Sequence, residues 1–300
     1  MRVLLPMLAL LLPLACGSTT PPEQRRADPT LSTLDRLSEE MELLGPGASW
    51  RSVTTSSFRV LYLSDEPVAR QVADAAERTR TRQQRLWHGG AARAPWSPRC
   101  DIYLYPSNRL LVQMSGGDAK SGSAAARPSR LLRGRMLQRR MNLAADDWQL
   151  LDSTLPHEVS HIIVAQLLGD RPVPLWANEG LAMLNETKRS RRRFERVLQR
   201  YRVRGQLFPL RTLTSMERYP DAEFNRLYYA QSLGLVRFLL SLGDRSQLLS
   251  LLRAGIGPRV VEQALRQHYG VGFEELTRGW LQWLSSADQA QVGRDPADKW

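Results

Sequence analysis

The chain has 300 residues, of which 42% are hydrophobic and 24% are charged. This length and composition suffice for one large or two small globular domains with a sizeable core, and they exclude a disordered or fibrous protein. The formal net charge of +12 favours an acidic partner, which could be nucleic acid, an anionic lipid surface or an acidic substrate. Charge alone does not choose among these three.

The N-terminal stretch MRVLLPMLALLLPLAC is typical of an export signal. A basic start is followed by an apolar run that is too short to span a bilayer, and then by Ala15 and Cys16. This end resembles the bacterial lipobox, in which the cysteine is lipidated and the chain is cut just before it. Pro13 departs from the lipobox pattern, so plain secretion and an uncleaved anchor stay open.

The expected organisation begins with a signal peptide over 1–15 and a polar, Pro-containing tether over 16–30. By resemblance to sorted lipoproteins, Ser18 in place of Asp favours the outer membrane, and the expected location is the cell envelope. The second cysteine, Cys100, is interpreted as a small buried residue rather than as half of a disulfide or a reactive thiol. No later apolar run reaches the roughly 18 residues of a membrane span.

Residues 31–148 are predicted to form an α/β part. Leucines at helical spacing over 31–41 indicate a first helix. The following segments predict a strand, a long polar-faced helix, a second strand and a loop, the last without the glycine spacing of a phosphate-binding loop. These segments are 56–64, 66–87, 100–107 and 115–128.

Residues 149–286 are predicted to be almost entirely helical, and 287–300 are expected to be a tail. Glycine, proline and aspartate breaks separate the periodic segments, which are 150–168, 176–203, 225–242, 245–253, 258–268 and 273–285. The predicted fold class is α+β, with a small α/β layer followed by a mainly helical lobe and a cleft between them.

The motif His-Glu-x-x-His occurs once, as HEVSH from His157 to His161. Histidines four residues apart lie on one face of a helix, so both imidazoles can bind one cation. Glu158 lies beside that face, where it can accept a proton from an attacking water and return it to a leaving amine. The alternative is a pair of surface histidines beside a solvated glutamate.

A third ligand is needed, because a hydrolytic zinc site uses three protein ligands and keeps one position for water. Glu179, in the stretch PLWANEGLAMLNE, follows His161 after a turn rich in Gly, Asp and Pro. That turn ends the first helix and leaves room for a second helix to bring the carboxylate back. His157, His161 and Glu179 therefore form the candidate ligand set for one zinc ion per chain.

The two motifs together, HEVSH and LWANEGLA with its WxNEG pattern, resemble those of the gluzincin metallopeptidases, in particular bacterial peptidase MA-like domains. The resemblance covers roughly 150–285 and implies that Glu158 is the general base and acid. It also implies that Tyr229, in LYYAQS, stabilises the oxyanion, with the adjacent Tyr228 as an alternative, and it gives Glu186 a supporting place near the metal.

The resemblance has limits. The motif spacing is slightly shorter than in the related aminopeptidases, and no element for a free amino terminus is recognisable. The expected activity is therefore zinc-dependent peptide hydrolysis, as an endopeptidase of the cell envelope acting on a peptide or protein. The competing interpretation is a non-catalytic envelope module that binds or assembles and retains a metal site.

The remaining histidines and the basic runs are interpreted more simply. His88 and His268 are expected near helix ends, although His268 could donate to an oxyanion. The run 188–204 is interpreted as a solvated helix face, with attraction to anionic lipid as the second interpretation and no nucleic-acid partner expected.

Overall fold

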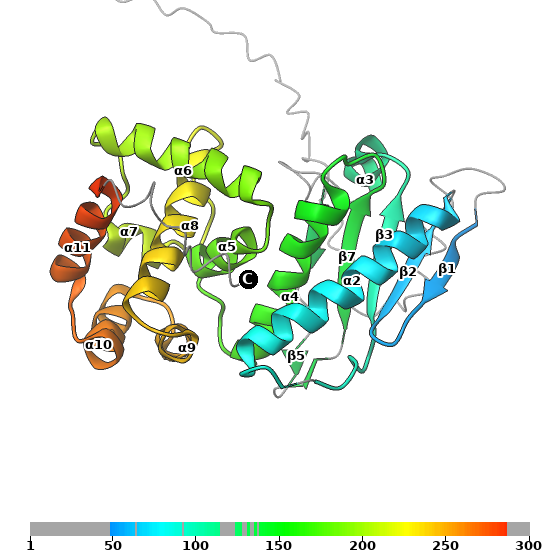
Figure 1. The fold of residues 1–300 in the computed structure, drawn as a ribbon, viewed down its shortest axis with the longest axis horizontal. Helices are drawn as coiled ribbons and strands as arrows, with labels where there is room; N and C mark the ends of the chain where they lie inside the picture. The colour runs from blue at the N-terminus through cyan, green and yellow to red at the C-terminus, as the bar shows by residue number, and fades with distance from the viewer. Residues whose placement is uncertain are drawn as a thin grey trace, which may run out of the picture.

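The computed structural model describes residues 49–286, except 64, 92, 115–123, 128–130, 133, 134 and 137. The predicted signal peptide, tether, first helix and tail lie outside the described residues, and so does Cys16. Two parts follow one another along the chain: a sheet covered by helices, and a lobe made of helices (Figure 1).

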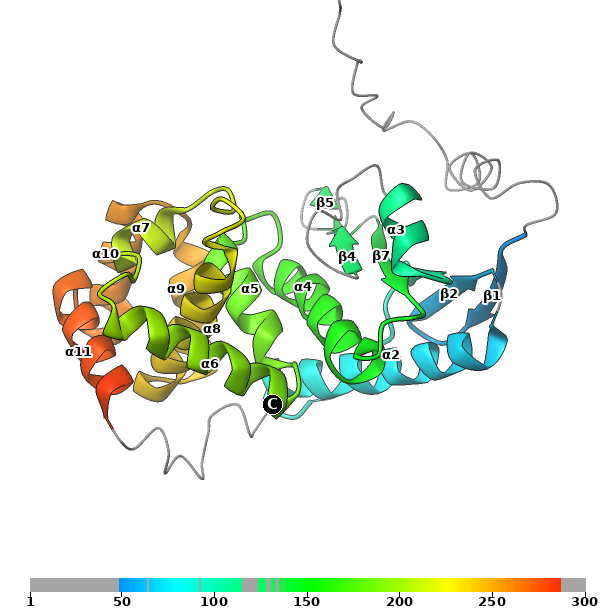
Figure 2. The ribbon, with the colours of Figure 1, turned by 90° about the horizontal axis from the view of Figure 1, so that it is seen from above.

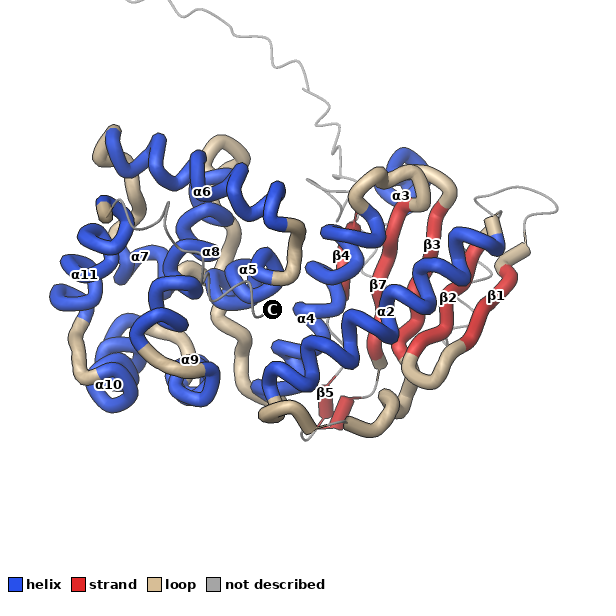
Figure 3. The backbone as a smooth tube through the Cα atoms, viewed as in Figure 1, coloured by secondary structure: helices blue, strands red, loops and turns tan. Residues whose placement is uncertain are grey.

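The sheet of the N-terminal part has five strands in the order β1-β2-β3-β7-β4 (Figure 3). The three central strands are parallel, whereas the edge strands β1 and β4 are antiparallel to their neighbours. A second, two-stranded sheet pairs β5 with β6. The strands are β1 Arg51–Thr54, β2 Phe58–Tyr62, β3 Cys100–Tyr105, β4 Ala124–Arg127, β5 Leu131–Leu132, β6 Arg135–Met136 and β7 Arg139–Ala144.

Helices α2 (Glu66–Trp87) and α4 (Leu155–Leu168) share one core with the sheet, and Figure 2 shows them side by side. α2 begins at Asp65, whose side chain accepts a hydrogen bond from the Val68 amide, as an N-cap does. The short helix α3 (Asn108–Met114) belongs to a separate, smaller core on the opposite face of the sheet, which includes alternate side chains of β2 and β3.

The C-terminal lobe has its own core, whose largest fully buried side chains include Trp176, Tyr228 and Trp280. Within it α5 and α8 pack closely, and α6 lies across α8 (Figure 1). The helices are α5 Leu175–Leu184, α6 Lys188–Val203, α7 Leu210–Ser215, α8 Asn225–Leu242, α9 Arg245–Ala254, α10 Pro258–Tyr269 and α11 Phe273–Ser285.

The α+β prediction is confirmed, but two local predictions are wrong. Residues 124–127, predicted as loop, form strand β4, because pairing with β7 rather than local pattern orders them. The single helix predicted over 176–203 is two helices, since α5 ends at Leu184 and Thr187 caps a new helix by accepting the Ser190 amide. Strands β1, β5, β6 and β7 and helices α3 and α7 were not predicted.

No helix of the described residues combines the length and the apolar character that crossing a membrane requires. Cys100 is buried and has a free thiol, as the interpretation of a small core residue predicted.

Candidate metal centre

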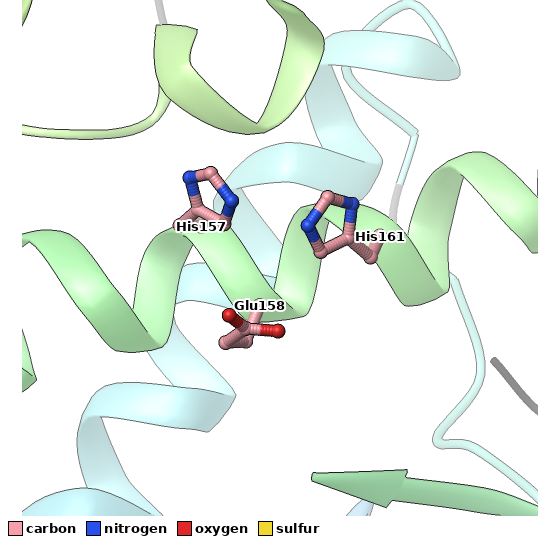
Figure 4. Close-up of side chains that lie close together, drawn as sticks. All are labelled: His157, Glu158 and His161. Atoms are coloured by element: carbon pink, nitrogen blue, oxygen red, sulfur yellow. The ribbon is translucent and has the colours of Figure 1, made fainter. Parts of the chain in front are cut away.

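Helix α4 holds both histidines of the HEVSH motif on a rigid support. Its side chains Leu155, Val159 and Ile162 are fully buried in the core shared with the sheet. His157 and His161 leave the helix on another side, one turn apart, with ring centroids 4.8 Å from each other (Figure 4). The helical spacing predicted from the sequence is therefore present, and packing of the opposite face fixes the orientation of α4.

Glu179 comes back to this pair from α5, where its side chain is buried. Its Oε2 lies 3.5 Å from Nε2 of His157 and 4.0 Å from Nε2 of His161. A tetrahedral zinc ion with bonds of about 2.0–2.1 Å separates its ligand atoms by roughly 3.3–3.5 Å. The two nitrogens and the oxygen suit zinc in type; the 3.5 Å distance to His157 fits this spacing, and the 4.0 Å distance to His161 exceeds it by about 0.5 Å.

Glu158 belongs to the same cluster, because His157, Glu158 and His161 offer ligand atoms that all lie within 4.8 Å of one another. Figure 4 shows the two imidazoles on one side of α4 and the Glu158 carboxylate on the other side of the ribbon. The Glu179 oxygen instead faces both Nε2 atoms. Geometry thus favours Glu179 as third ligand and leaves Glu158 beside the site, where a base is needed.

Glu186 accepts a hydrogen bond at 2.8 Å from Nδ1 of His157, when that nitrogen carries the proton. This bond would leave Nε2 free as an acceptor for a metal, an arrangement common behind metal-binding histidines. The predicted helix 176–203 would carry Glu186 on the same helix as Glu179. Glu186 lies instead past the end of α5, and Arg191 holds this turn by donating to the backbone oxygens of Leu184 and Glu186.

Electrostatics couples these groups. Burial alone would lower the pKa of His157, but the carboxylates of Glu179 and Glu186 raise it well above 6.5. Burial likewise opposes ionisation of Glu179, yet the charges of the two histidines and a tyrosine hydroxyl lower its pKa to about 2. The buried carboxylate is therefore ionised at neutral pH, as a ligand for a divalent cation must be.

Tyr219 also contacts the candidate centre, and no sequence motif indicated it. This residue lies in the segment between α7 and α8, and its hydroxyl donates to Oε1 of Glu179 at 2.5 Å. Its ring also contacts the rings of Tyr228 and Tyr229. An isolated tyrosine in a polar connection carries no periodic signal, so only the fold brings it to the site.

The structure distinguishes the two tyrosines of LYYAQS. Tyr228 is fully buried in the core of the helical lobe. Tyr229 is partly buried, and burial together with the charges of the three site carboxylates raises the pKa of its hydroxyl. The Tyr229 hydroxyl therefore stays protonated and remains a hydrogen-bond donor at neutral pH.

The other two histidines lie at helix ends, as predicted. His88 is the C-terminal cap of α2, and His268 lies in the last turn of α10.

A His-Glu-x-x-His helix on an α+β scaffold, with a carboxylate returned from the next helix, is the arrangement of a zincin-like peptidase domain. Residues 141–286 match the family model described as Peptidase MA superfamily. This match runs from β7 to the end of α11 and so includes every residue of the candidate centre. The comparison with curated proteins gave no match.

Proposed function

We propose that the protein is a zinc-dependent metallopeptidase of the gluzincin type that hydrolyses peptide bonds as an endopeptidase. The observation that carries the proposal is the approach of one buried Glu179 oxygen to the Nε2 atoms of both motif histidines. Together with Glu158 beside them, these groups supply a ligand set and a base within one cluster. Bound zinc would supply Lewis acidity, lowering the pKa of water and polarising a carbonyl.

Residues of the chain supply proton transfer, oxyanion stabilisation and orientation of a ligand. Glu158, which is 7% exposed and adjoins the histidine pair, accepts the proton of the attacking water and returns it to the leaving amine. The protonated hydroxyl of Tyr229 donates to the oxyanion that develops on the carbonyl oxygen. Glu186 holds His157 in the tautomer and orientation that a ligand needs.

Strand β4 suits a peptide substrate. It is the last strand of its sheet, pairs with β7 on one side and packs against α4, which carries both histidines (Figure 3). Among the described residues no strand pairs with its outer edge. An extended peptide could add to that edge through backbone hydrogen bonds, which read chain direction rather than a particular side chain. This favours cleavage within a chain.

The first test is the zinc content of the purified full-length chain, measured by elemental mass spectrometry beside His157→Ala and Glu179→Gln. We expect about one zinc per chain in the unaltered protein and loss of most of it in both variants. Glu158→Gln should keep its zinc but lose hydrolysis of a denatured protein by about 10²-fold or more.

Undiminished hydrolysis in Glu158→Gln would contradict the assignment of the base. Mass spectrometry of the products separates internal fragments, which the proposal expects, from single residues released at an end.

The second candidate is a non-catalytic binding or assembly module, because the Peptidase MA family includes members without catalysis. This role would be favoured if the purified chain held a metal but hydrolysed no denatured protein, and if its fold collapsed when the metal was chelated. We further propose that the chain works in the cell envelope as a lipoprotein anchored at Cys16, on the basis of the N-terminal sequence. Mass spectrometry of the N-terminal peptide from cell membranes tests this anchor.

A further inference from the structure

Helix α6 presents a face of exposed cations to solvent. The exposed side chains of this face are Lys188, Arg189, Arg192, Arg193, Arg196 and Arg200. At 3.6 residues per turn they occupy about two fifths of the helix circumference. We call these six residues the α6 basic face.

The opposite side of α6 fixes the helix to the lobe. Leu198 is buried in the core of the lobe, and Arg191 is buried with its guanidinium on the turn after α5. The helix contains one acidic residue, Glu195, which pairs with Arg237 of α8 rather than with the basic face. The basic side chains are thus held on a rigid support.

The most exposed large hydrophobic side chains lie at the two ends of this face. Trp148 is 78% exposed and Val203 is 77% exposed, more than any other large hydrophobic residue of the described chain. Trp148 lies beside the first turn of α6, where the Arg189 guanidinium is 6.0 Å from the centre of its ring. Val203 is the last residue of the helix. Viewed along the helix axis, it lies in the middle of the α6 basic face.

Cations flanked by an exposed tryptophan and an aliphatic residue match the surface of an anionic bilayer. Tryptophan favours the boundary between head groups and acyl chains, and lysine and arginine are attracted to anionic head groups. Nucleic acid would also attract cations, but it gives no reason for an exposed valine between them. The apolar N-terminal run and the polar segment after it would, moreover, keep this lobe near a membrane.

We propose that the α6 basic face, with Trp148 and Val203, docks the helical lobe on an anionic lipid surface. The proposal does not depend on catalysis, because neither the cations nor the two hydrophobic residues belong to the candidate metal centre. Docking through α6 would set the orientation of the lobe at the membrane, whereas an N-terminal anchor alone would leave it free to turn.

Partitioning of the full-length chain between buffer and vesicles tests the proposal. The quantity compared is the ratio of partition coefficients on phosphatidylcholine vesicles with and without phosphatidylglycerol, because the apolar contribution of the N-terminal run cancels in this ratio. Each cation near such a surface contributes about fivefold, so the ratio should exceed about tenfold at low salt. It should approach one at about 1 M salt, where the Debye length is about 3 Å.

The decisive variant is Arg192→Glu/Arg193→Glu/Arg196→Glu. Its matched control, Arg78→Glu/Arg171→Glu/Arg259→Glu, changes the net charge equally at exposed arginines elsewhere. We expect the α6 variant to lose at least about tenfold of the anionic preference and the control to lose less than about threefold. Trp148→Ala should weaken binding to the anionic vesicles without changing its salt dependence, and all variants should keep the thermal midpoint.

Equal losses in the α6 variant and the control would overturn the proposal, because the preference would then follow net charge alone. It would also be overturned if the α6 variant kept its vesicle binding while losing retention on duplex DNA, since the face would then recognise nucleic acid. Zinc content and hydrolysis should be unchanged in the α6 variant, so failure here is distinct from failure of the proposed peptidase activity.

Discussion

At the scale of single residues, each oxygen of the Glu179 carboxylate has its own partner. Oε2 faces the two histidines, while Oε1 accepts the Tyr219 hydroxyl. A carboxylate held in this way cannot rotate to exchange its oxygens without breaking the tyrosine bond. Tyr219 therefore positions the candidate third ligand, although it belongs to neither sequence motif.

Tyr219→Phe removes only this hydroxyl and should weaken zinc binding by about tenfold, at the lower end of the effect of groups that orient metal ligands. The dissociation constant is measured by competition with a chromophoric chelator. Tyr201→Phe, which changes a partly buried tyrosine of α6, is the control and should bind zinc as the unaltered chain does. Equal affinity of Tyr219→Phe and the unaltered chain would show that Glu179 needs no such support.

The proximity of the three candidate ligands could be predicted from sequence because it rests on local rules. Spacing on one helix brings His157 and His161 together, and a glycine-proline break explains how Glu179 returns to them. Tyr219 could not be found in this way, since its place depends on how the α7–α8 connection folds over α5. The contact of Glu186 with His157 shows an intermediate case, in which the neighbourhood was predicted correctly and the supporting helix was not.

At the scale of elements, the close approach of α5 to α8 depends on Gly180, the residue after Glu179, because it has no side chain. A methyl group on Gly180 would meet the Ser232 carbonyl oxygen and lie 2.6 Å from Cγ2 of Val236. Backbone cannot move aside as a flexible side chain can, so α5 would have to shift. The position of the ligand Glu179 thus depends on a glycine in the helix interior.

Gly180→Ala should lower the free energy of unfolding by about 1–3 kcal/mol, because overpacking outweighs the gain in helix propensity. It should also weaken zinc binding, since α5 carries Glu179. Gly279→Ala is the matched control in α11, where the added carbon would meet only Phe238, at 3.3 Å. Denaturant unfolding of both variants measures the difference, and a fully stable Gly180→Ala would refute the close packing.

A second element contact ties the turn between β1 and β2 to α2. Oε1 of Glu77 accepts hydrogen bonds from the Thr55 and Ser56 hydroxyls and the Ser57 amide. Burial of the Glu77 carboxyl opposes ionisation, but these bonds outweigh it and lower its pKa below 4.5. Its stabilisation is therefore complete above about pH 4.5 and is lost as the pH falls through the folded-state pKa.

Glu77→Gln should lower the free energy of unfolding by about 1 kcal/mol at neutral pH. This is less than the loss of hydrogen bonds to a fully buried charged group, because solvent reaches this carboxylate. At an acidic pH below the folded-state pKa of Glu77, the variant and the unaltered chain should unfold with nearly the same free energy. Urea titrations at the two pH values give the comparison. A difference that does not depend on pH would mean that the ionised form of Glu77 plays no part.

Long periodic elements were predicted well, and short ones were not. The helices α2 and α8 to α11 fall close to their predicted ranges, because each repeats its apolar residues over several turns. Strands such as β1 and β4 have four residues each, too few for a period, and they form because a neighbouring strand pairs with them. The break before α6 did leave a signal, the capping residue Thr187, which the continuous basic run obscured.

At the scale of the whole molecule, the candidate centre joins two cores. The first turns of α4 pack into the core of the sheet, whereas its residues Val164 and Leu168, like α5, belong to the core of the helical lobe. Sequence periodicity identifies the apolar face of a helix but not the core that receives it. The α+β class could therefore be predicted, whereas the sharing of α4 with the sheet could not.

Removal of zinc should loosen this junction without unfolding either core. A ligand present at 10²–10³ times its dissociation constant stabilises by about 3–4 kcal/mol, which for a chain of this size corresponds to roughly 5–15 °C in the thermal midpoint. Chelation should produce that decrease with unchanged far-ultraviolet circular dichroism, and added zinc should reverse it. His157→Ala should not respond to the chelator, and a chelator response in that variant would place the metal elsewhere.

The candidate ligands come from two helices, His157 and His161 from α4 and Glu179 from α5, so we expect zinc affinity to depend on how these helices are aligned. A substitution far from the centre that tilts the lobe by a fraction of an ångström would move Glu179 relative to the histidines. Such a variant would bind less metal, and its thermal midpoint would fall to that of the zinc-free chain and no further. Compared in the presence of a chelator, the variant and the unaltered chain would unfold at the same temperature.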